Sequence, residues 1–117
     1  MPDLTRKEVI KILATSQNAR LAGVDLSGLD LSGLNFSGAD LIRTDLSHTD
    51  LSNAYMRGVR MEDANLEGAT LVNVNLKEAN LKGSCLRGAN LTRANLTDAN
   101  LFQVNLEDTQ RLQVKGM

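Results

Sequence analysis

Aspartate or asparagine recurs at five-residue intervals over most of the chain, from Asp25 to Asn105. Such carboxylates and amides can act as acids, bases or ligands when a fold gathers several of them in one cleft. A residue that recurs in register with a repeat is instead placed by that repeat, and its side chain can hydrogen-bond to the backbone of neighbouring turns. We therefore predict a structural role for this column of residues and no catalytic residue in it.

The other chemistry-bearing side chains are scattered. His48 is the only histidine and Cys85 the only cysteine, and they occupy different positions of the five-residue pattern. A catalytic cysteine needs a base nearby, and a structural zinc site needs about four ligands. The sequence thus predicts neither an enzyme nor a metal or cofactor site. Tyr55 and Phe102 are predicted to be exposed aromatic residues, a type that can anchor a protein partner.

A large apolar residue follows each of these polar residues. The burial of this apolar column must determine where the polar column lies. A period of five suits neither an α-helix, which would advance about 140° per repeat, nor a flat strand, whose side chains alternate between two faces. The chain must therefore bend once per repeat to point the whole column inward. The predicted core consists of Leu21, Leu26, Leu31, Phe36, Leu41, Leu46, Leu51, Met56, Met61, Leu66, Leu71, Leu76, Leu81, Leu86, Leu91, Leu96, Leu101 and Leu106.

The remaining positions of the repeat indicate where the bend falls. A small residue, most often alanine, stands two places before each large one, so that both point inward from an extended backbone. Glycine often takes the second position after the large residue, where it provides the positive φ of a type II turn; examples are Gly28, Gly33 and Gly38. We expect a different turn where bulky residues take this position, which are Arg43, His48, Glu78 and Arg93.

Units that extend and then turn can bury a persistent inward column by coiling around it. The pattern Ala-(Asp/Asn)-Leu-x-x, as in Ala-Asn-Leu-Thr-Arg at residues 89–93, resembles that of the pentapeptide-repeat family. The resemblance covers residues 19–110. It implies an all-β solenoid, a right-handed quadrilateral β-helix with four repeats per coil and about four and a half coils in this chain.

Residues 1–18 precede the repeats and carry a helix signal from about residue 5 to residue 15. Thr5 and Glu8 have the spacing of a capping box. A helix this short is unstable alone, so we expect it to cap the first coil. Without such a cap, the coil would expose leucine side chains and unpaired backbone groups.

The segment from Leu4 to Ser32 has a second, narrower resemblance. It is similar to the segment that opens the repeat region of a BTB/POZ protein of the potassium-channel tetramerisation domain-containing group. Those proteins are substrate adaptors for cullin-based ubiquitin ligases, and their BTB domain recruits the cullin. We expect no BTB domain within these residues, so the resemblance implies a substrate-recognition region and not a complete adaptor.

Composition limits the classes of partner. The 117 residues carry 13 basic and 14 acidic side chains, a formal net charge of −1, which argues against broad affinity for nucleic acid. No apolar run has the length of a membrane span, and no signal peptide is recognised, so we expect an intracellular protein, cytoplasmic or nuclear, that binds no membrane. A single cysteine allows no internal disulfide, which fits that location.

Negative charge on one side of the expected coil suggests an alternative function as a DNA mimic. Some bacterial members of the family resemble duplex DNA and bind DNA gyrase. The acidic face carries Asp25, Asp45, Glu67, Glu107 and Asp108, with Arg87 in opposition. This charge is sparse for a DNA mimic. The leading hypothesis is a non-enzymatic protein–protein interaction scaffold that resembles the recognition region of a ubiquitin-ligase adaptor. The alternative is a freestanding pentapeptide-repeat protein, for which binding to a topoisomerase or gyrase as a DNA mimic is one candidate function.

After Gln110 the pattern stops, and residues 111–117 carry no helix signal that would cover the last coil. An uncovered coil presents unpaired strand groups and an apolar cross-section. We therefore expect a two-fold homodimer joined through the C-terminal coils. The residues expected at or near the junction are Leu101, Phe102, Leu106, Leu112 and Val114. A tail that folds back across the opening, or further coils in a longer native protein, are the alternatives.

Overall fold

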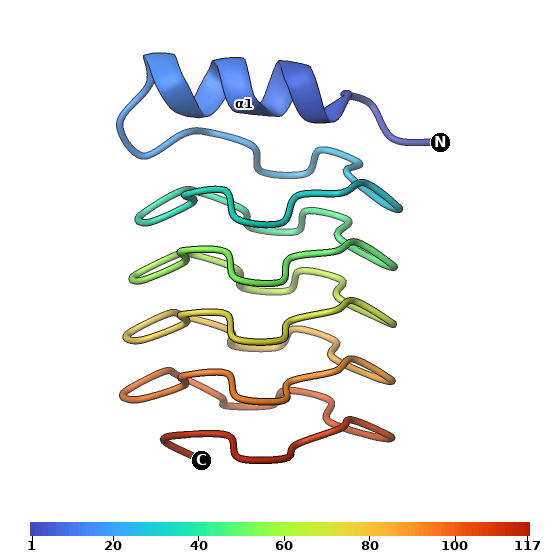
Figure 1. The fold of residues 1–117 in the computed structure, drawn as a ribbon, viewed down its shortest axis with the longest axis vertical. Helices are drawn as coiled ribbons and strands as arrows, with labels where there is room; N and C mark the ends of the chain where they lie inside the picture. The colour runs from blue at the N-terminus through green and yellow to red at the C-terminus, as the bar shows by residue number, and fades with distance from the viewer.

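In the computed structural model, which describes residues 1–117, one helix is followed by a stack of coils (Figure 1). From Arg20 onward, every fifth residue forms a single parallel bridge with the residue 20 positions later, ending with the pair Asn95 and Lys115. Four five-residue repeats therefore make one coil. The expected all-β fold is present as a ladder of isolated bridges without extended strands, because a turn in every repeat interrupts the strand.

Backbone hydrogen bonds join each coil to its neighbours. From Leu21 to Leu96, the amide of each large inward residue donates to the following coil, as Leu51 does to the carbonyl of Thr70 at 2.8 Å. The amide before it donates to the preceding coil, as Asp50 does to the carbonyl of Leu29 at 3.0 Å. A third bond closes the turn within the repeat, as from the Ala54 amide to the Leu51 carbonyl at 3.1 Å. This ladder satisfies backbone groups that the frequent turns would otherwise leave unpaired.

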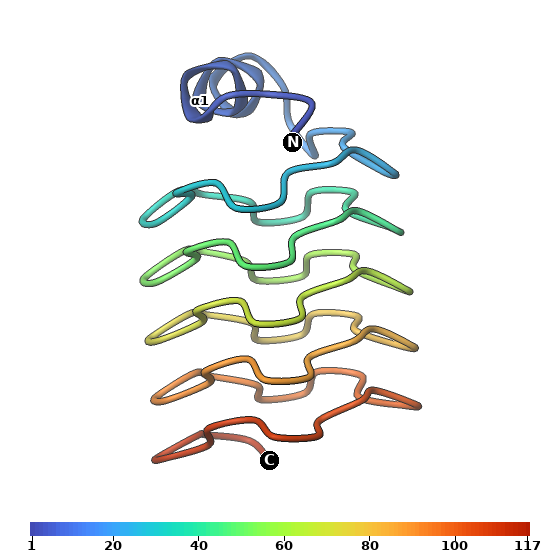
Figure 2. The ribbon, with the colours of Figure 1, turned by 90° about the vertical axis from the view of Figure 1, so that its right-hand side faces the viewer.

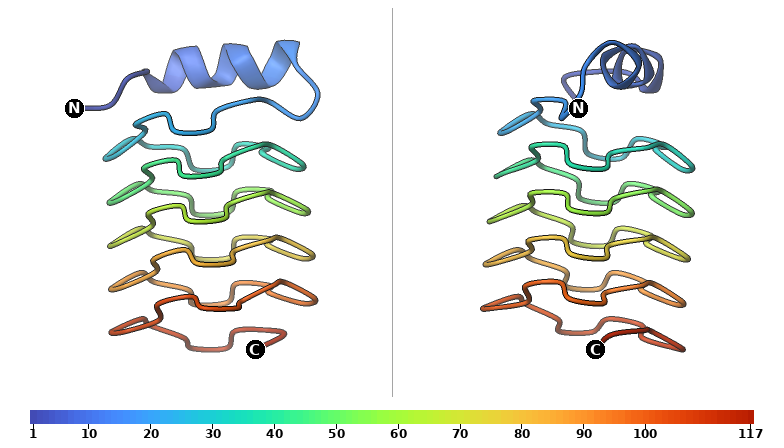
Figure 3. Two further views of the ribbon diagram at one scale, coloured as in Figure 1. Left: turned by 180° about the vertical axis from the view of Figure 1, so that it is seen from behind. Right: turned by 90° about the vertical axis from the view of Figure 1, so that its left-hand side faces the viewer.

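The predicted column of large residues runs through the interior of the stack. Its 16 members from Leu21 to Leu96 are at most 2 % exposed and belong to one core cluster with the small inward residues. The other two members, Leu101 and Leu106, lie in the last coil and are half-buried. The coils are stacked in line and have similar outlines from each side (Figures 2 and 3).

The helix α1 (Arg6–Thr15) lies across the first coil (Figures 2 and 3). Thr5 and Glu8 form a reciprocal cap: the Thr5 hydroxyl accepts from the Glu8 amide at 3.2 Å, and the Glu8 carboxylate accepts from the Thr5 amide at 3.0 Å. Val9 is fully buried, and Ile12 packs against the core. The helix thus covers the apolar end of the coil. No helix of the structure has the length and apolar character needed to cross a membrane.

The sequence predicts different backbone angles for turns with glycine and for turns with a bulky residue, but the φ angle is positive in both. The φ angle is positive at all four bulky turn residues: 56° at Arg43, 58° at His48, 62° at Glu78 and 61° at Arg93. The expectation that bulky residues avoid positive φ is therefore wrong. The eight turn glycines have φ of 67–73°, nearer to the type II value of about 80°, whereas the bulky residues stay near the left-handed helical value of about 57°.

The inter-coil ladder explains the shared sign of φ. The amide of Arg43 donates to the carbonyl of Glu62 at 3.0 Å, as the amide of Gly23 donates to that of Ile42 at 2.9 Å. The same bond must form whichever residue occupies the position. A non-glycine residue in this region costs about 1 kcal/mol or more, which the neighbouring coils must offset.

The coil geometry continues beyond residue 110. Lys115 forms a bridge with Asn95, and the Arg93 amide donates to the Leu112 carbonyl at 2.9 Å. Residues 111–115 therefore extend the last coil and do not fold back across its opening (Figure 1). The leucine column gave no sign of this extension because the ladder uses backbone groups, and Arg111 occupies the position of the next large residue.

Candidate functional site

The aspartate and asparagine column serves the turns. Each side-chain oxygen accepts a hydrogen bond from the amide two residues later, which forms an Asx turn. Asp50 accepts from Ser52 at 2.9 Å, and Asn75 accepts from Lys77 at 3.1 Å. The same contact forms at Asp25, Asp30, Asn35, Asp40, Asp45, Asn65, Asn80, Asn90, Asn95, Asn100 and Asn105. The structural role predicted for this column is the one observed.

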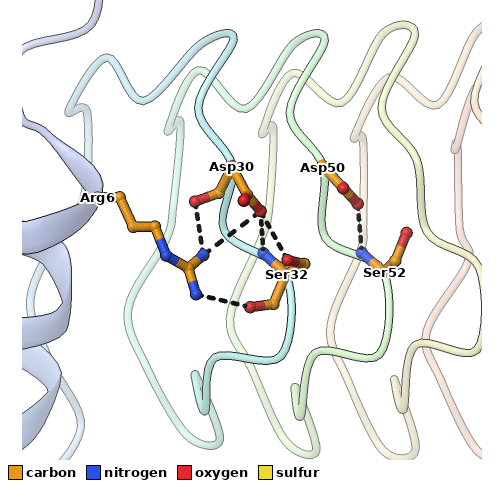
Figure 4. A network of polar contacts seen from close by, with 5 residues as sticks. All are labelled: Arg6, Asp30, Ser32, Asp50 and Ser52. Carbon is orange, nitrogen blue, oxygen red and sulfur yellow. Dashed lines mark hydrogen bonds and ion pairs between the residues drawn. The ribbon is translucent and has the colours of Figure 1, made fainter.

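Asp30 shows how these contacts affect a carboxylate (Figure 4). The Ser32 hydroxyl donates to Asp30 Oδ1 at 2.6 Å and the Ser32 amide donates at 3.0 Å, while the Arg6 guanidinium lies 3.4 Å away. The Ser32 hydroxyl, then its amide, and to a smaller extent Arg6 lower the pKa of Asp30. Asp30 is therefore ionised at neutral pH and is a poor proton donor.

His48 and Cys85 remain apart from partners that could make them reactive. The His48 ring lies against Gly68 of the following coil, where a Cβ atom would come within 2.5 Å of its Nδ1. Cys85 is half-buried between Asn65 and Asn105 in its column. No group of three or more histidine, cysteine, aspartate or glutamate side chains is placed to hold a metal ion. These residues are best explained as parts of the coil surface.

Two aromatic residues interrupt the outer pattern and are exposed, as the sequence predicted. Tyr55 is 58 % exposed and lies between Asn35 and Asn75, at a position where Asx residues elsewhere close the turn. Phe102 is 60 % exposed, and Lys82 Nζ lies 5.9 Å from the centre of its ring. The chain gives up a turn hydrogen bond at Tyr55, so the needs of the coil do not explain that residue.

The last coil leaves backbone and apolar groups uncovered. The amides of Leu81 and Gly83 each donate to this coil at 2.9 Å, but the corresponding amides of Leu101 and Gln103 have no acceptor. The five residues expected at a dimer junction all lie in this coil and are half-buried or exposed: Leu101, Phe102, Leu106, Leu112 and Val114. This end therefore resembles a sheet edge and a core section that another molecule could cover.

A cavity of about 430 Å³ lies at the opposite end, between the C-terminal end of α1 and the first coil. The helix contributes Leu13, the connection contributes residues 16–18, and the first coil contributes Asn35, Phe36 and Ser37. Sequence reasoning missed this cavity because it depends on how the connection between helix and coil crosses the first coil. No periodic signal in the sequence describes that path.

The sequence profile described as "Pentapeptide repeats" matches the chain with 8 copies, over residues 19–58, 60–98 and 71–108. No curated protein sequence matches the chain at a significant level. The matched residues include most of the coils and exclude α1.

Solved structures of pentapeptide-repeat proteins are similar to this chain. One from the Arabidopsis thaliana thylakoid lumen is 37 % identical with a TM-score of 0.73, and the alignment covers 75 % of this chain and 61 % of that one. Rfr23 from the cyanobacterium Cyanothece 51142 is 33 % identical with a TM-score of 0.42, covering 80 % and 65 %. QnrB1, a plasmid-mediated fluoroquinolone resistance protein, is 20 % identical with a TM-score of 0.40, covering 77 % and 54 %.

The chain thus spans less than two thirds of the length of each of these proteins. The profile match and the thylakoid-lumen structure imply a right-handed quadrilateral β-helix. The superpositions on Rfr23 and QnrB1 have TM-scores below 0.5 and imply nothing further about this chain.

Proposed function

Because the chain belongs to the pentapeptide-repeat family, we propose that it is a non-enzymatic scaffold for protein–protein interaction. This proposal rests mainly on which outward side chains are engaged within the coil and which are free to contact a partner. The Asx side chains are occupied in closing turns, so within that column contacts to a partner fall to residues that depart from the pattern. Tyr55 is the exposed aromatic residue among these, in the middle of the stack. A rigid coil presents such a residue with little ordering cost on binding.

The substitution Tyr55→Asn tests this proposal. It removes the aromatic side chain and restores the Asx residue found directly above and below it, at Asn35 and Asn75, so the variant should melt no lower than the parent. Thr70→Asn makes the matching change on another face and serves as the control. We expect quantitative affinity capture from the source cells to recover a partner whose yield falls about tenfold or more with Tyr55→Asn and is unchanged with Thr70→Asn.

Equal recovery with the parent and both variants would count against Tyr55 as the contact. Substrate turnover in a broad enzymatic screen would count against the scaffold proposal itself.

The resemblance of the segment from Leu4 to Ser32 supports a narrower form of the proposal, in which the chain is the substrate-recognition region of a cullin-type ubiquitin-ligase adaptor. This form rests on that sequence likeness alone, and it carries with it an intracellular location, cytoplasmic or nuclear. The complete gene provides the test. A BTB domain encoded before Leu4, together with co-precipitation of a cullin by the full-length product, would support it, and a gene without a BTB domain would rule it out.

The acidic face supports the alternative of a topoisomerase-binding DNA mimic less well. Asp25 and Asp45 stack in one column, but the column continues with the uncharged residues Asn65, Cys85 and Asn105. Duplex DNA carries one negative charge per about 1.7 Å, so an interrupted column is a poor copy. Inhibition of gyrase supercoiling by the purified chain would favour this alternative, and we expect none.

We also propose self-association through the last coil. A two-fold arrangement would cover the half-buried side chains of Leu101 and Leu106. It would also let the unpaired amides of one copy, such as that of Leu101, donate to open carbonyls of the other, such as that of Val104. Light scattering after chromatography, at about tens of micromolar, should give a dimer mass for the intact chain and a monomer mass for Leu106→Lys. A monomer mass for the intact chain would end this proposal.

A further inference from the structure

The first coil carries backbone carbonyls that point away from the stack, and the chain supplies donors for only some of them. In the second coil, the carbonyl of Asp50 accepts from the Leu31 amide at 2.7 Å, and that of Ser52 accepts from the Gly33 amide at 2.9 Å. No coil precedes the first one to provide such amides. Its carbonyls must find other donors or remain open.

Arg6 provides the donors on the face of Asp30. Its Nη1 donates to the Asp30 carbonyl at 2.8 Å and to Asp30 Oδ1 at 3.4 Å, and its Nη2 donates to the Ser32 carbonyl at 3.2 Å (Figure 4). One guanidinium therefore takes the place of the two amides that a further coil would contribute. A planar guanidinium with several fixed donors suits this task, whereas a single ammonium does not.

The next repeat offers the same acceptors without a donor. Asn35 and Ser37 follow Asp30 and Ser32 by five residues, and Asn35 Oδ1 accepts from the Ser37 amide at 2.9 Å, as Asp30 Oδ1 does from Ser32 at 3.0 Å. No group of the protein donates to the carbonyl of Asn35 or of Ser37. Both residues line the cavity of about 430 Å³ beside α1. The Asp30 site thus carries a negative charge and binds Arg6, whereas the Asn35 site is neutral and binds no side chain of the protein.

The rest of the cavity favours a cationic side chain. The last turn of α1 contains no basic residue, so the partial negative charge of the helix C-terminus is not offset there. None of the lining residues is charged, so no lysine or arginine within the cavity would repel a cation. Leu13 adds apolar surface along which the methylene stem of an arginine can lie.

We propose that this cavity binds an arginine side chain of a partner protein in the way that Asp30 and Ser32 bind Arg6. The inference rests on the proposed scaffold function and names the chemistry of one contact. Because Asn35 is neutral where Asp30 is ionised, the isolated contact is weak, with a millimolar dissociation constant. It contributes specificity within a larger interface.

A titration of the isotopically labelled intact chain with N-acetyl-arginine amide, followed by NMR, tests the proposal. We expect saturable shifts confined to the amides of residues 16–19 and 35–37. Asn35→Asp recreates the acceptors of the Asp30 site and should tighten binding about two- to fivefold. This variant should fold, because aspartate already makes the same turn contact at Asp50.

Asn75→Asp is the matched control. It places the same charge on the same face two coils away, where the Asn75 carbonyl already accepts from the Met56 amide at 2.8 Å, so the affinity should not change. N-acetyl-lysine amide should bind more weakly than the arginine probe, because one ammonium cannot span both carbonyls as a fork.

Absent or dispersed shifts, or an equal effect of Asn35→Asp and Asn75→Asp, would overturn the proposal. Free arginine that binds more tightly than the blocked probe would point to a small metabolite and would overturn the assignment to a partner protein. None of these variants changes Tyr55. The scaffold proposal would then still be judged separately by the capture experiment.

Discussion

The two ends of the stack differ in how far their core residues and backbone groups are covered. At the N-terminal end α1 covers the core, Asp3 donates its amide to the Asp25 carbonyl at 2.6 Å and accepts from the Asp25 amide at 2.8 Å, and Arg6 binds the next face. At the C-terminal end Leu101 and Leu106 are half-buried. The repeat therefore accounts for the interior of the stack. Residues outside the repeat, such as Asp3 and Arg6, cover the N-terminal end.

The largest effect should arise between the ends, where the ladder is complete on both sides. Leu71→Asp places a carboxylate in the interior column between Leu51 and Leu91, where nothing can pair with it. We expect a loss of about 4 kcal/mol or more in the free energy of unfolding, enough to unfold the middle of the stack. Val72→Asp, at the adjacent turn, should cost less than about 1 kcal/mol. Matching thermal melts for the two variants would refute the inward and outward assignment.

A pair of truncations on one face measures the difference between the ends. Leu26 and Leu106 occupy the same column position in the first and last coils, but Leu26 is fully buried and Leu106 is half-buried. We expect Leu26→Ala to cost about 2–5 kcal/mol and Leu106→Ala about 1 kcal/mol. Urea denaturation at a concentration that keeps the chain monomeric provides the measurement. Equal losses would show that the last coil is as well packed as the first.

Arg6 tests the closure of the N-terminal end by hydrogen bonds. Its removal in Arg6→Ala leaves the carbonyls of Asp30 and Ser32 without donors, and the expected loss is about 1 kcal/mol because the site is partly exposed. Lys7→Ala removes a neighbouring charge that is solvent-exposed and should change stability by a few tenths of a kcal/mol at most, about the usual surface value. Chemical denaturation of both variants compares them. If Lys7→Ala cost as much, charge alone would explain the effect.

The smallest expected effect is a pH dependence at the same end. Since the folded state lowers the pKa of Asp30, its ionised form adds stability above the unfolded value near 3.8, and this contribution is lost as pH falls below it. Asp30→Asn should therefore flatten the fall in melting temperature below that pH, while leaving the curve above it nearly parallel to the parent. A variant curve with the full acid dependence would assign that dependence to other carboxylates.

Features carried by recurrent spacing could be predicted from the sequence. The interior column is marked by its five-residue spacing, and the Asx turns and the Thr5 and Glu8 cap form between residues two or three positions apart. Other features depend on contacts between distant segments. The positive φ at Arg43 follows from its bond to the next coil, and the extension to Lys115 follows from pairing with residues 20 positions earlier. No local pattern reports such contacts.

The same limit applies to the candidate sites. Tyr55 could be recognised because it breaks a repeat. The bridging contact of Arg6 and the open acceptors of Asn35 and Ser37 could not, because they arise where the helix and its connection meet the first coil. An arginine near the N-terminus gives no sign in sequence of which carbonyls it will reach.

Native-state amide hydrogen exchange, followed by NMR on dilute monomeric protein, tests the difference between the ends most directly. We predict slow exchange at Leu21 and Gly23, whose amides donate to the second coil at 2.8 Å and 2.9 Å. Leu101 and Gln103, whose amides have no acceptor, should exchange almost as fast as in an unstructured peptide. Protection that rises with protein concentration at Leu101 and Gln103 would locate self-association at this end. Protection equal to that of Leu21 in dilute monomer would contradict an open last coil.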